Sequence, residues 1–187
     1  MSSSAYSPIP ELNRLKEFEE RVEGEPFSDG FELFPYGRVA SLGPNPPAEM
    51  RARLIPFAQA THSGSFYALW TCDDRADLAT LPVIFCGDEG DLFIAARNVR
   101  ELFRLLAADD ADDPDDVPAR DAYVSWLKDT FDLTPAEDPG AVYDAALSEY
   151  GRAFCDWWLT FDDEDGIIAD LLEEVAEGED SHQDTAL

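Results

Sequence analysis

Residues that commonly carry catalysis or bind metal are scarce in this 187-residue chain, which has 2 histidines and 3 cysteines. His62 lies in a stretch that reads as a hairpin loop and His182 lies near the C-terminus, so neither is expected on a rigid element. A catalytic triad or a histidine-ligated zinc site needs imidazoles that rigid neighbours hold in place. The chain also has no GxSxG, Walker or GxGxxG motif. We therefore expect no catalytic triad, no metal site and no cofactor.

The cysteines and the apolar runs indicate a cellular location. Cys72, Cys86 and Cys155 are widely spaced and form no CxxC pair, so Cys86 and Cys155 are expected as buried apolar residues rather than disulfide partners. No apolar run approaches the ~18 residues of a membrane-spanning helix. Residues 1–10 have neither a basic leader nor an apolar core. These features predict a reduced, cytoplasmic protein with no membrane partner.

Basic side chains are few and unevenly distributed. The chain has 13 lysines and arginines against 41 aspartates and glutamates, a net charge of −28. Residues 1–104 contain 10 basic and 16 acidic side chains, whereas residues 105–187 contain 3 and 25. Such a negative surface repels nucleic acid and anionic lipid, and it attracts basic proteins or cations. The alternative is that the acidity only keeps the protein soluble in a salty cytoplasm.

With 45% hydrophobic and 12% aromatic residues, the chain can fill the core of one domain. We predict a flexible arm at residues 1–10, a single α+β domain at 11–176 and a flexible tail at 177–187. Within this domain, residues 11–107 are sheet-rich, residues 108–118 form an acidic low-complexity linker and residues 119–176 are helical.

Four short apolar runs separated by turn residues predict neighbouring strands of one sheet, at residues 54–60, 65–71, 82–86 and 91–96. Their continuous apolar character indicates that both faces of the sheet are covered, and it places Phe85 in the core. Asn98 with Glu101 three residues later resembles a capping box and predicts a helix at residues 98–107 across the sheet. Further helices are predicted at residues 11–22, 119–130, 141–161 and 166–176, with two more short strands at 31–35 and 38–42.

The charged clusters match no known ligand site. The acidic runs at residues 109–118 and 162–166 lack the ligand spacing of a calcium-binding EF-hand and are expected to be solvated loops. Carboxylates are too abundant for the sequence to single out a general acid and base. The densest basic cluster is Arg97, Arg100 and Arg104, which we expect to pair with the acidic second half of the chain.

Part of the chain resembles a known family. The matching pieces are IPFA at 55–58, GSFYAL at 64–69, PVIF at 82–85, the turn GDEG at 87–90, and Ala95-Ala96 before a helix with Leu102, Leu105 and Leu106. They resemble the SUKH superfamily, which includes fungal cell-wall synthesis regulators and many bacterial immunity proteins. The match covers under a third of the chain. Ser65 replaces a frequent acidic residue of the family, and no NGG-like turn follows the first helix.

The resemblance implies an α+β fold with a central, mostly antiparallel sheet flanked by helices, here with an acidic helical C-terminal half. It also implies a non-enzymatic role in which the protein binds a partner, often a toxin domain, and blocks its active site. The family has no shared catalytic set, so no functional residue is carried over.

The sequence therefore predicts an immunity protein that neutralises a basic toxin domain such as a nuclease. We expect it to bind no nucleic acid, membrane or small-molecule ligand. Its partner is expected to contact the carboxylates of residues 109–180 and those tryptophan anchors that prove to be exposed. The candidate residues are Asp162, Asp163, Glu164, Asp165, Trp126, Trp157 and Trp158. Two alternatives remain: an intracellular regulatory or scaffold protein of the cell-wall synthesis regulator type, and a hydrolase with a carboxylate pair.

Overall fold

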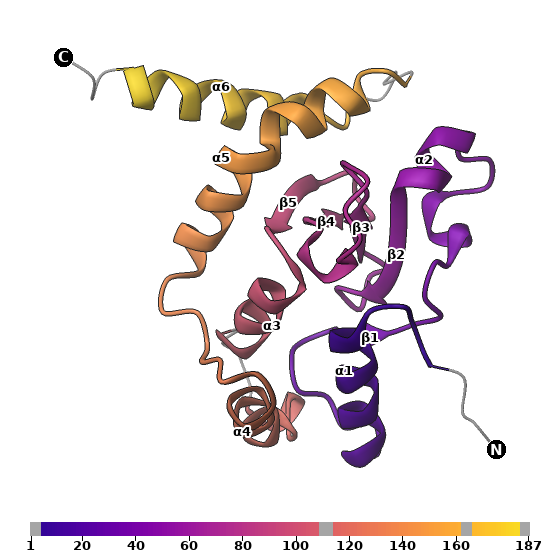
Figure 1. The fold of residues 1–187 in the computed structure, drawn as a ribbon, viewed down its shortest axis with the longest axis vertical. Helices are drawn as coiled ribbons and strands as arrows, with labels where there is room; N and C mark the ends of the chain where they lie inside the picture. Colours follow the sequence, from indigo (N-terminus) through magenta and orange to yellow (C-terminus); the bar gives the residue numbers. More distant parts are fainter. Residues whose placement is uncertain (1–4, 109–113, 162–165, 184–187) are drawn as a thin grey trace.

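One antiparallel sheet lies between two layers of helices in a computed structural model, which describes residues 5–108, 114–161 and 166–183 (Figure 1). The strands are β1 (Glu32–Leu33), β2 (Leu54–Gln59), β3 (Phe66–Trp70), β4 (Val83–Cys86) and β5 (Leu92–Ala96). The α-helices are α1 (Pro10–Arg21), α2 (Ala48–Arg53), α3 (Val99–Ala108), α4 (Arg120–Phe131), α5 (Pro139–Trp158) and α6 (Ala169–Gln183). Short 3-10 turns are η1 (Val39–Leu42), η2 (Leu78–Thr80) and η3 (Pro114–Asp116). The fold class is α+β, as predicted.

The five strands follow chain order, β1-β2-β3-β4-β5, and each pairs antiparallel with the next. The four strands predicted from the apolar runs are β2 to β5, so this prediction is confirmed. Both predicted hairpins close by backbone hydrogen bonds. The amide of Ala60 donates to the carbonyl of Ser65 at 2.8 Å, and the amide of Gly87 donates to that of Asp91 at 2.7 Å.

Each face of the sheet is buried under a different set of helices. Leu69 and Val83 pack with residues of α1, α3 and α4, whereas Trp70 and Ile84 pack with Phe154 of α5 and with α6. Because neighbouring residues of a strand point to opposite faces, a strand that is covered on both sides must be apolar at consecutive positions. This explains the continuous apolar runs and confirms that both faces are covered.

Phe85 is half-buried and packs against the core, so it is less enclosed than predicted. Ile84, its neighbour on β4, is 0% exposed and lies against α5 and α6 instead. Phe85 points to the opposite face, at the hairpin end of the sheet, where it packs against Tyr67 and Phe93. The apolar run alone could not distinguish the two residues, because the helix that covers the Phe85 face does not extend over the hairpin end.

Helix α3 begins as the sequence predicts. The side-chain oxygen of Asn98 accepts a hydrogen bond from the amide of Glu101 at 2.9 Å. The Glu101 carboxylate accepts from the amide of Arg97 at 3.0 Å, one residue earlier than in a standard capping box. The Arg97 guanidinium pairs with the same carboxylate.

The segment before the sheet departs from the prediction. The region expected as a strand at residues 38–42 is the 3-10 turn η1, which ends at Gly43 with a φ of 94°. The unpredicted helix α2 follows Pro47 and leads directly into β2. The helix was not predicted because the connector before it is rich in proline. A proline just before the first turn is nevertheless compatible with helix initiation.

Both predicted flexible ends are more ordered than expected where the structure describes them. The Tyr6 hydroxyl lies 2.5 Å from the carbonyl oxygen of Phe34 and 2.9 Å from that of Phe57, and Ile9 is 1% exposed. Residues 6–9 are therefore packed against the sheet rather than forming an arm. Helix α6 continues to Gln183, beyond the predicted boundary at 176. Of the predicted linker, residues 109–113 lie outside the described chain.

Candidate protein-binding surface

Trp126 is part of the core, so the prediction that it anchors a partner is wrong. It is 7% exposed and lies on the inner side of α4. Its ring centroid is 5.1 Å from that of Phe18 in α1, 5.9 Å from Phe103 in α3 and 5.4 Å from Tyr123. Three helices therefore enclose it, and no partner can reach it without unfolding the domain.

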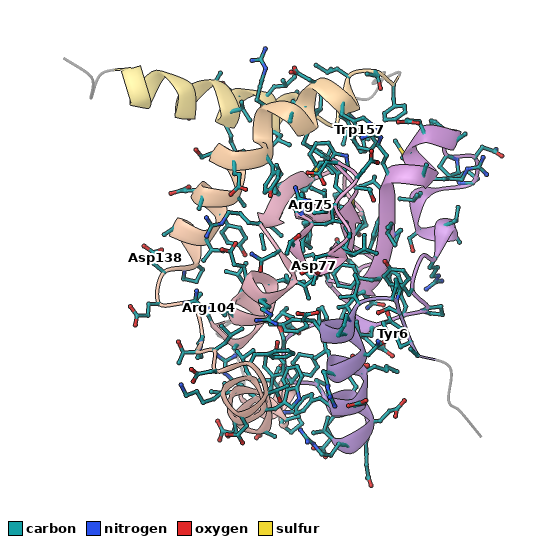
Figure 2. All side chains as sticks on the ribbon, in the orientation of Figure 1. Tyr6, Arg75, Asp77, Arg104, Asp138 and Trp157 are labelled. Carbon is teal, nitrogen blue, oxygen red and sulfur yellow. The ribbon has the colours of Figure 1, made fainter. Side chains whose placement is uncertain are left out.

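Trp157 and Trp158 end α5 at a corner where α5, α6 and the sheet meet (Figure 2). Both are half-buried. The ring of Trp157 lies 5.6 Å from that of Trp70 on β3, which fixes the end of α5 against the sheet. Phe161 lies 5.2 Å from Trp157 and 6.4 Å from Trp158, and Leu159 between them is 49% exposed. We call Trp157, Trp158, Leu159 and Phe161 the α5–α6 corner.

Two indole N–H groups at this corner lack a hydrogen-bond partner among the described residues. The Nε1 atoms of Trp70 and Trp157 are both buried, and neither donates to a protein atom. A buried indole usually finds an acceptor, because its N–H group is costly to remove from water. These two indoles are therefore held by ring packing, without a hydrogen bond from either N–H group to a described residue.

The predicted acidic residues Asp162, Asp163, Glu164 and Asp165 lie outside the described residues. The chain around them is strongly acidic: the 35 residues after Arg152 contain 12 aspartates and glutamates and no lysine or arginine. Asp170, Glu173 and Glu174 on α6 are exposed and form no ion pair with any side chain that the structure describes. We call these three residues the acidic edge of α6. Asp156, beside Trp157, pairs with Arg152 at 3.2 Å in an exposed position.

Arg97, Arg100 and Arg104 form fewer ion pairs with the acidic second half than predicted. Arg100 pairs with Glu11 of α1 at 3.0 Å, and Arg104 donates to the carbonyl oxygen of Thr134 at 2.9 Å. Only Arg97 of the three pairs with a described carboxylate of the second half, where its guanidinium lies 3.9 Å from Glu149. These arginines tie α3 to its neighbours, so they leave the acidic edge of α6 without a basic partner.

Arg75, which the sequence did not single out, links the sheet region to α5. Its guanidinium donates to both carboxylate oxygens of Asp73, at 2.7 and 2.6 Å, and to the carbonyl oxygen of Thr80 at 2.6 Å. It also lies over the ring of Tyr150 of α5, 6.0 Å from the centroid (Figure 2 labels Arg75). The guanidinium lowers the pKa of Asp73 to about 2. We call Arg75 with Asp73, Thr80 and Tyr150 the Arg75 clamp, and it positions α5 against the sheet region.

The remaining histidine and cysteine residues form no catalytic or metal-binding group with other described residues. His62 is exposed in the β2–β3 loop, with Nε2 3.3 Å from Asp29. Cys155 is buried as predicted, and burial raises its thiol pKa to about 11, so it is held protonated. Within the described chain, no three histidine, cysteine or acidic side chains are placed to share a metal ion. No helix in that part of the chain is both long and apolar enough to cross a membrane.

Two surface hollows lie away from the α5–α6 corner. One of about 550 Å³ is lined by η1, the proline-rich connector and Arg51 of α2. Another of about 270 Å³ lies at the end of α1 and includes Glu19. Glu19 accepts hydrogen bonds from the amide of Leu33 at 3.0 Å and from Lys16 at 3.1 Å, and burial raises its pKa. Glu19 therefore ties β1 to α1.

Comparison of the chain with protein-family models, with curated proteins and with solved structures found no match in any of the three.

The sequence located two of the four residues of the corner. Leu159 and Phe161 were not singled out because the sequence predicted one continuous helix over residues 141–161. The helix ends at Trp158 instead, and the chain turns away with Leu159 exposed. An apolar residue immediately before an acidic run is the local signal that could have identified this end.

Proposed function

We propose that this protein is a non-enzymatic binding module that holds a basic protein partner at the α5–α6 corner and along the acidic edge of α6. We further propose that the partner is a toxin domain such as a nuclease, whose active site the module blocks. The observation that carries the proposal is the combination of half-buried tryptophans with a neighbouring acidic edge that has no basic partner among the described residues.

The charge supports fast association. A nuclease presents a cationic groove to hold phosphate, so an acidic surface can occupy that groove in place of the substrate. Steering of this kind raises association rates to ~10⁸–10⁹ M⁻¹s⁻¹ at low salt. At physiological salt the Debye length is ~8 Å, so charge alone does not hold the complex. Tight binding needs an apolar anchor as well.

The corner supplies such an anchor. Tryptophan is enriched among the residues that contribute most to binding energy at interfaces, where it sits in a desolvated contact surrounded by polar residues. Trp158 and Leu159 present apolar surface to solvent, while Trp157 holds them against the sheet through Trp70. Exposed carboxylates of α6 provide the polar surround.

The test first asks whether an adjacent gene encodes a secreted toxin-like protein, and it then uses that protein in growth rescue on co-expression and in calorimetry at 50 and 500 mM salt. Asp170→Asn, Glu173→Gln and Glu174→Gln are combined in one variant, and residues 162–165 are neutralised in a second. The matched control carries Glu20→Gln, Glu23→Gln and Glu25→Gln, three exposed carboxylates near the end of α1. We expect at least a tenfold loss of affinity for the acidic-edge variant at low salt and less than twofold for the control.

Trp158→Ala should weaken binding at both salt concentrations, because its contribution is apolar. Equal losses for the α1 control and the acidic-edge variant would contradict the proposed surface. Binding without growth rescue would favour the regulatory or scaffold alternative. If the toxin-like protein does not bind, or if no such protein is encoded, the immunity proposal fails.

A further inference from the structure

A row of aromatic side chains crosses the hairpin end of the sheet on the face opposite Ile84. Tyr67 on β3 is the register partner of Phe85 on β4, which is in turn the register partner of Phe93 on β5. The ring centroids are 5.8 Å apart for Tyr67 and Phe85 and 4.5 Å apart for Phe85 and Phe93. Tyr143 of α5 continues the row, with its ring 5.9 Å from Phe93 and 88° from its plane. We call these four residues the aromatic row.

The row is only partly covered by the rest of the described chain. One step farther from the hairpins on the same face, Leu69, Val83 and Ala95 are at most 1% exposed beneath the helices. The three sheet residues of the row are half-buried instead, and Tyr143 is 39% exposed. Tyr67 packs edge-to-face against Phe85, and Phe85 stacks on Phe93. Adjoining, partly exposed aromatic rings on a domain surface are typical of a contact site for another protein.

The rim of the row is acidic. Asp88, Glu89 and Asp91 are exposed in the β4–β5 hairpin, and strand alternation places Asp91 on the same face as Phe93. Asp88 accepts hydrogen bonds from the hydroxyls of Ser63 at 2.9 Å and Ser65 at 2.6 Å. These bonds fix the carboxylate beside the end of the row and keep it ionised.

The row meets α5 at Tyr143, so a partner that lies along α5 can contact both the row and the α5–α6 corner, which lie on opposite faces of the sheet. Tyr143 and Trp158 are 15 residues apart on α5, which corresponds to about 22 Å along the helix axis and about 60° around it. A standard protein interface covers about 800 Å² on each partner and spans such a distance. Resting on the function proposed above, we infer that the aromatic row is a second anchor for the same basic partner. It takes an aliphatic side chain of that partner, flanked by a lysine or arginine that pairs with the hairpin carboxylates.

The inference can be tested with two eight-residue peptides, one alternating lysine with leucine and the other lysine with serine. Both carry the same charge, so they differ only in the apolar side chain offered to the row. We expect the lysine–leucine peptide to bind at least tenfold more tightly at 150 mM salt. In NMR titration it should shift the amide signals of β4, β5 and residues 141–145. Tyr143→Ser should remove most of this preference, and Asp91→Asn should weaken both peptides.

Val39→Ser is the matched control, because Val39 is 44% exposed but lies on η1, away from the row. Its effect should stay within twofold. Equal binding of the two peptides, or shifts confined to residues 156–161, would overturn the second anchor while leaving the proposed function intact. If neither peptide bound anywhere, both the second anchor and the proposed attraction for basic partners would be wrong.

Discussion

The crossing of α5 and α6 depends on a glycine, and Gly151→Ala tests how closely the two helices approach. A Cβ at this position would lie 2.7 Å from Cγ2 of Val175 and 3.0 Å from Cδ1 of Leu147. Leu147 can move the end of its side chain, but Val175 is β-branched and 7% exposed, so it has little freedom to turn away. Helix α6 would therefore have to shift.

Two opposing effects set the size of the change. Replacing glycine by alanine inside a helix stabilises it by about 0.8–1.0 kcal/mol. Overpacking a buried contact costs about 1–3 kcal/mol. We expect a net destabilisation of about 1 kcal/mol, measured as the free energy of unfolding in urea with an unchanged denaturant dependence.

Gly178→Ala is the matched control, because Gly178 is also inside a helix but its Cβ would meet no atom within 4 Å. This change should stabilise the helix by about 0.5–1 kcal/mol. In a Val175→Ala background, Gly151→Ala should also become favourable, a coupling of about 1–3 kcal/mol between neighbouring sites. If both glycines respond alike, or if the Val175 background makes no difference, the close approach of α5 and α6 is wrong.

Three further predictions concern the core and the Arg75 clamp. Ile84→Ala should cost about 2–5 kcal/mol and more than Phe85→Ala in the same urea assay, because Phe85 is only half-buried; the reverse order would contradict the strand orientation. Trp126→Ala should cost about 3–5 kcal/mol, and a measured loss under about 1 kcal/mol would mean that Trp126 is not enclosed. Arg75→Gln should raise the carboxyl pKa of Asp73 from about 2 toward its ordinary value, followed by NMR titration. The Arg75–Asp73 ion pair contributes its full stabilisation above the unfolded-state pKa of Asp73, and this stabilisation is lost as pH falls from about 4 toward 2. An unchanged pKa of Asp73 in the variant would rule out the clamp.

Secondary structure in the middle of the chain was predictable because its signals are local. Glycine turns at residues 64 and 87–90 separate apolar runs whose length suits strands, and Asn98 with Glu101 starts α3. Each of these features acts within a few residues. The connector before the sheet was predicted poorly because its prolines are compatible with both an extended chain and the first turn of α2.

The candidate surface was predictable only in part. Trp126 and Trp158 both lie in predicted helices with apolar neighbours. The acidic run after Phe161 distinguishes them locally, but it does not determine how deeply either ring is buried. Phe18 and Phe103 enclose Trp126, and both come from helices distant in sequence. Trp158 is half-buried and packs against Phe154, Trp157 and Phe161 of its own segment. The same residue type is therefore enclosed in one helix and partly exposed in the other.

The sequence by itself determined the strands, the start of α3 and the concentration of negative charge after residue 104, because hydrophobic periodicity, capping and composition are properties of short segments. Only the tertiary structure decided which apolar faces are covered. Phe85 is left half-buried because the helices on its face stop short of the hairpin end, and Ile84 is buried because α5 and α6 cross the other face. Burial depends on contacts between elements that are far apart in the chain, and these contacts cannot be predicted from a short segment alone.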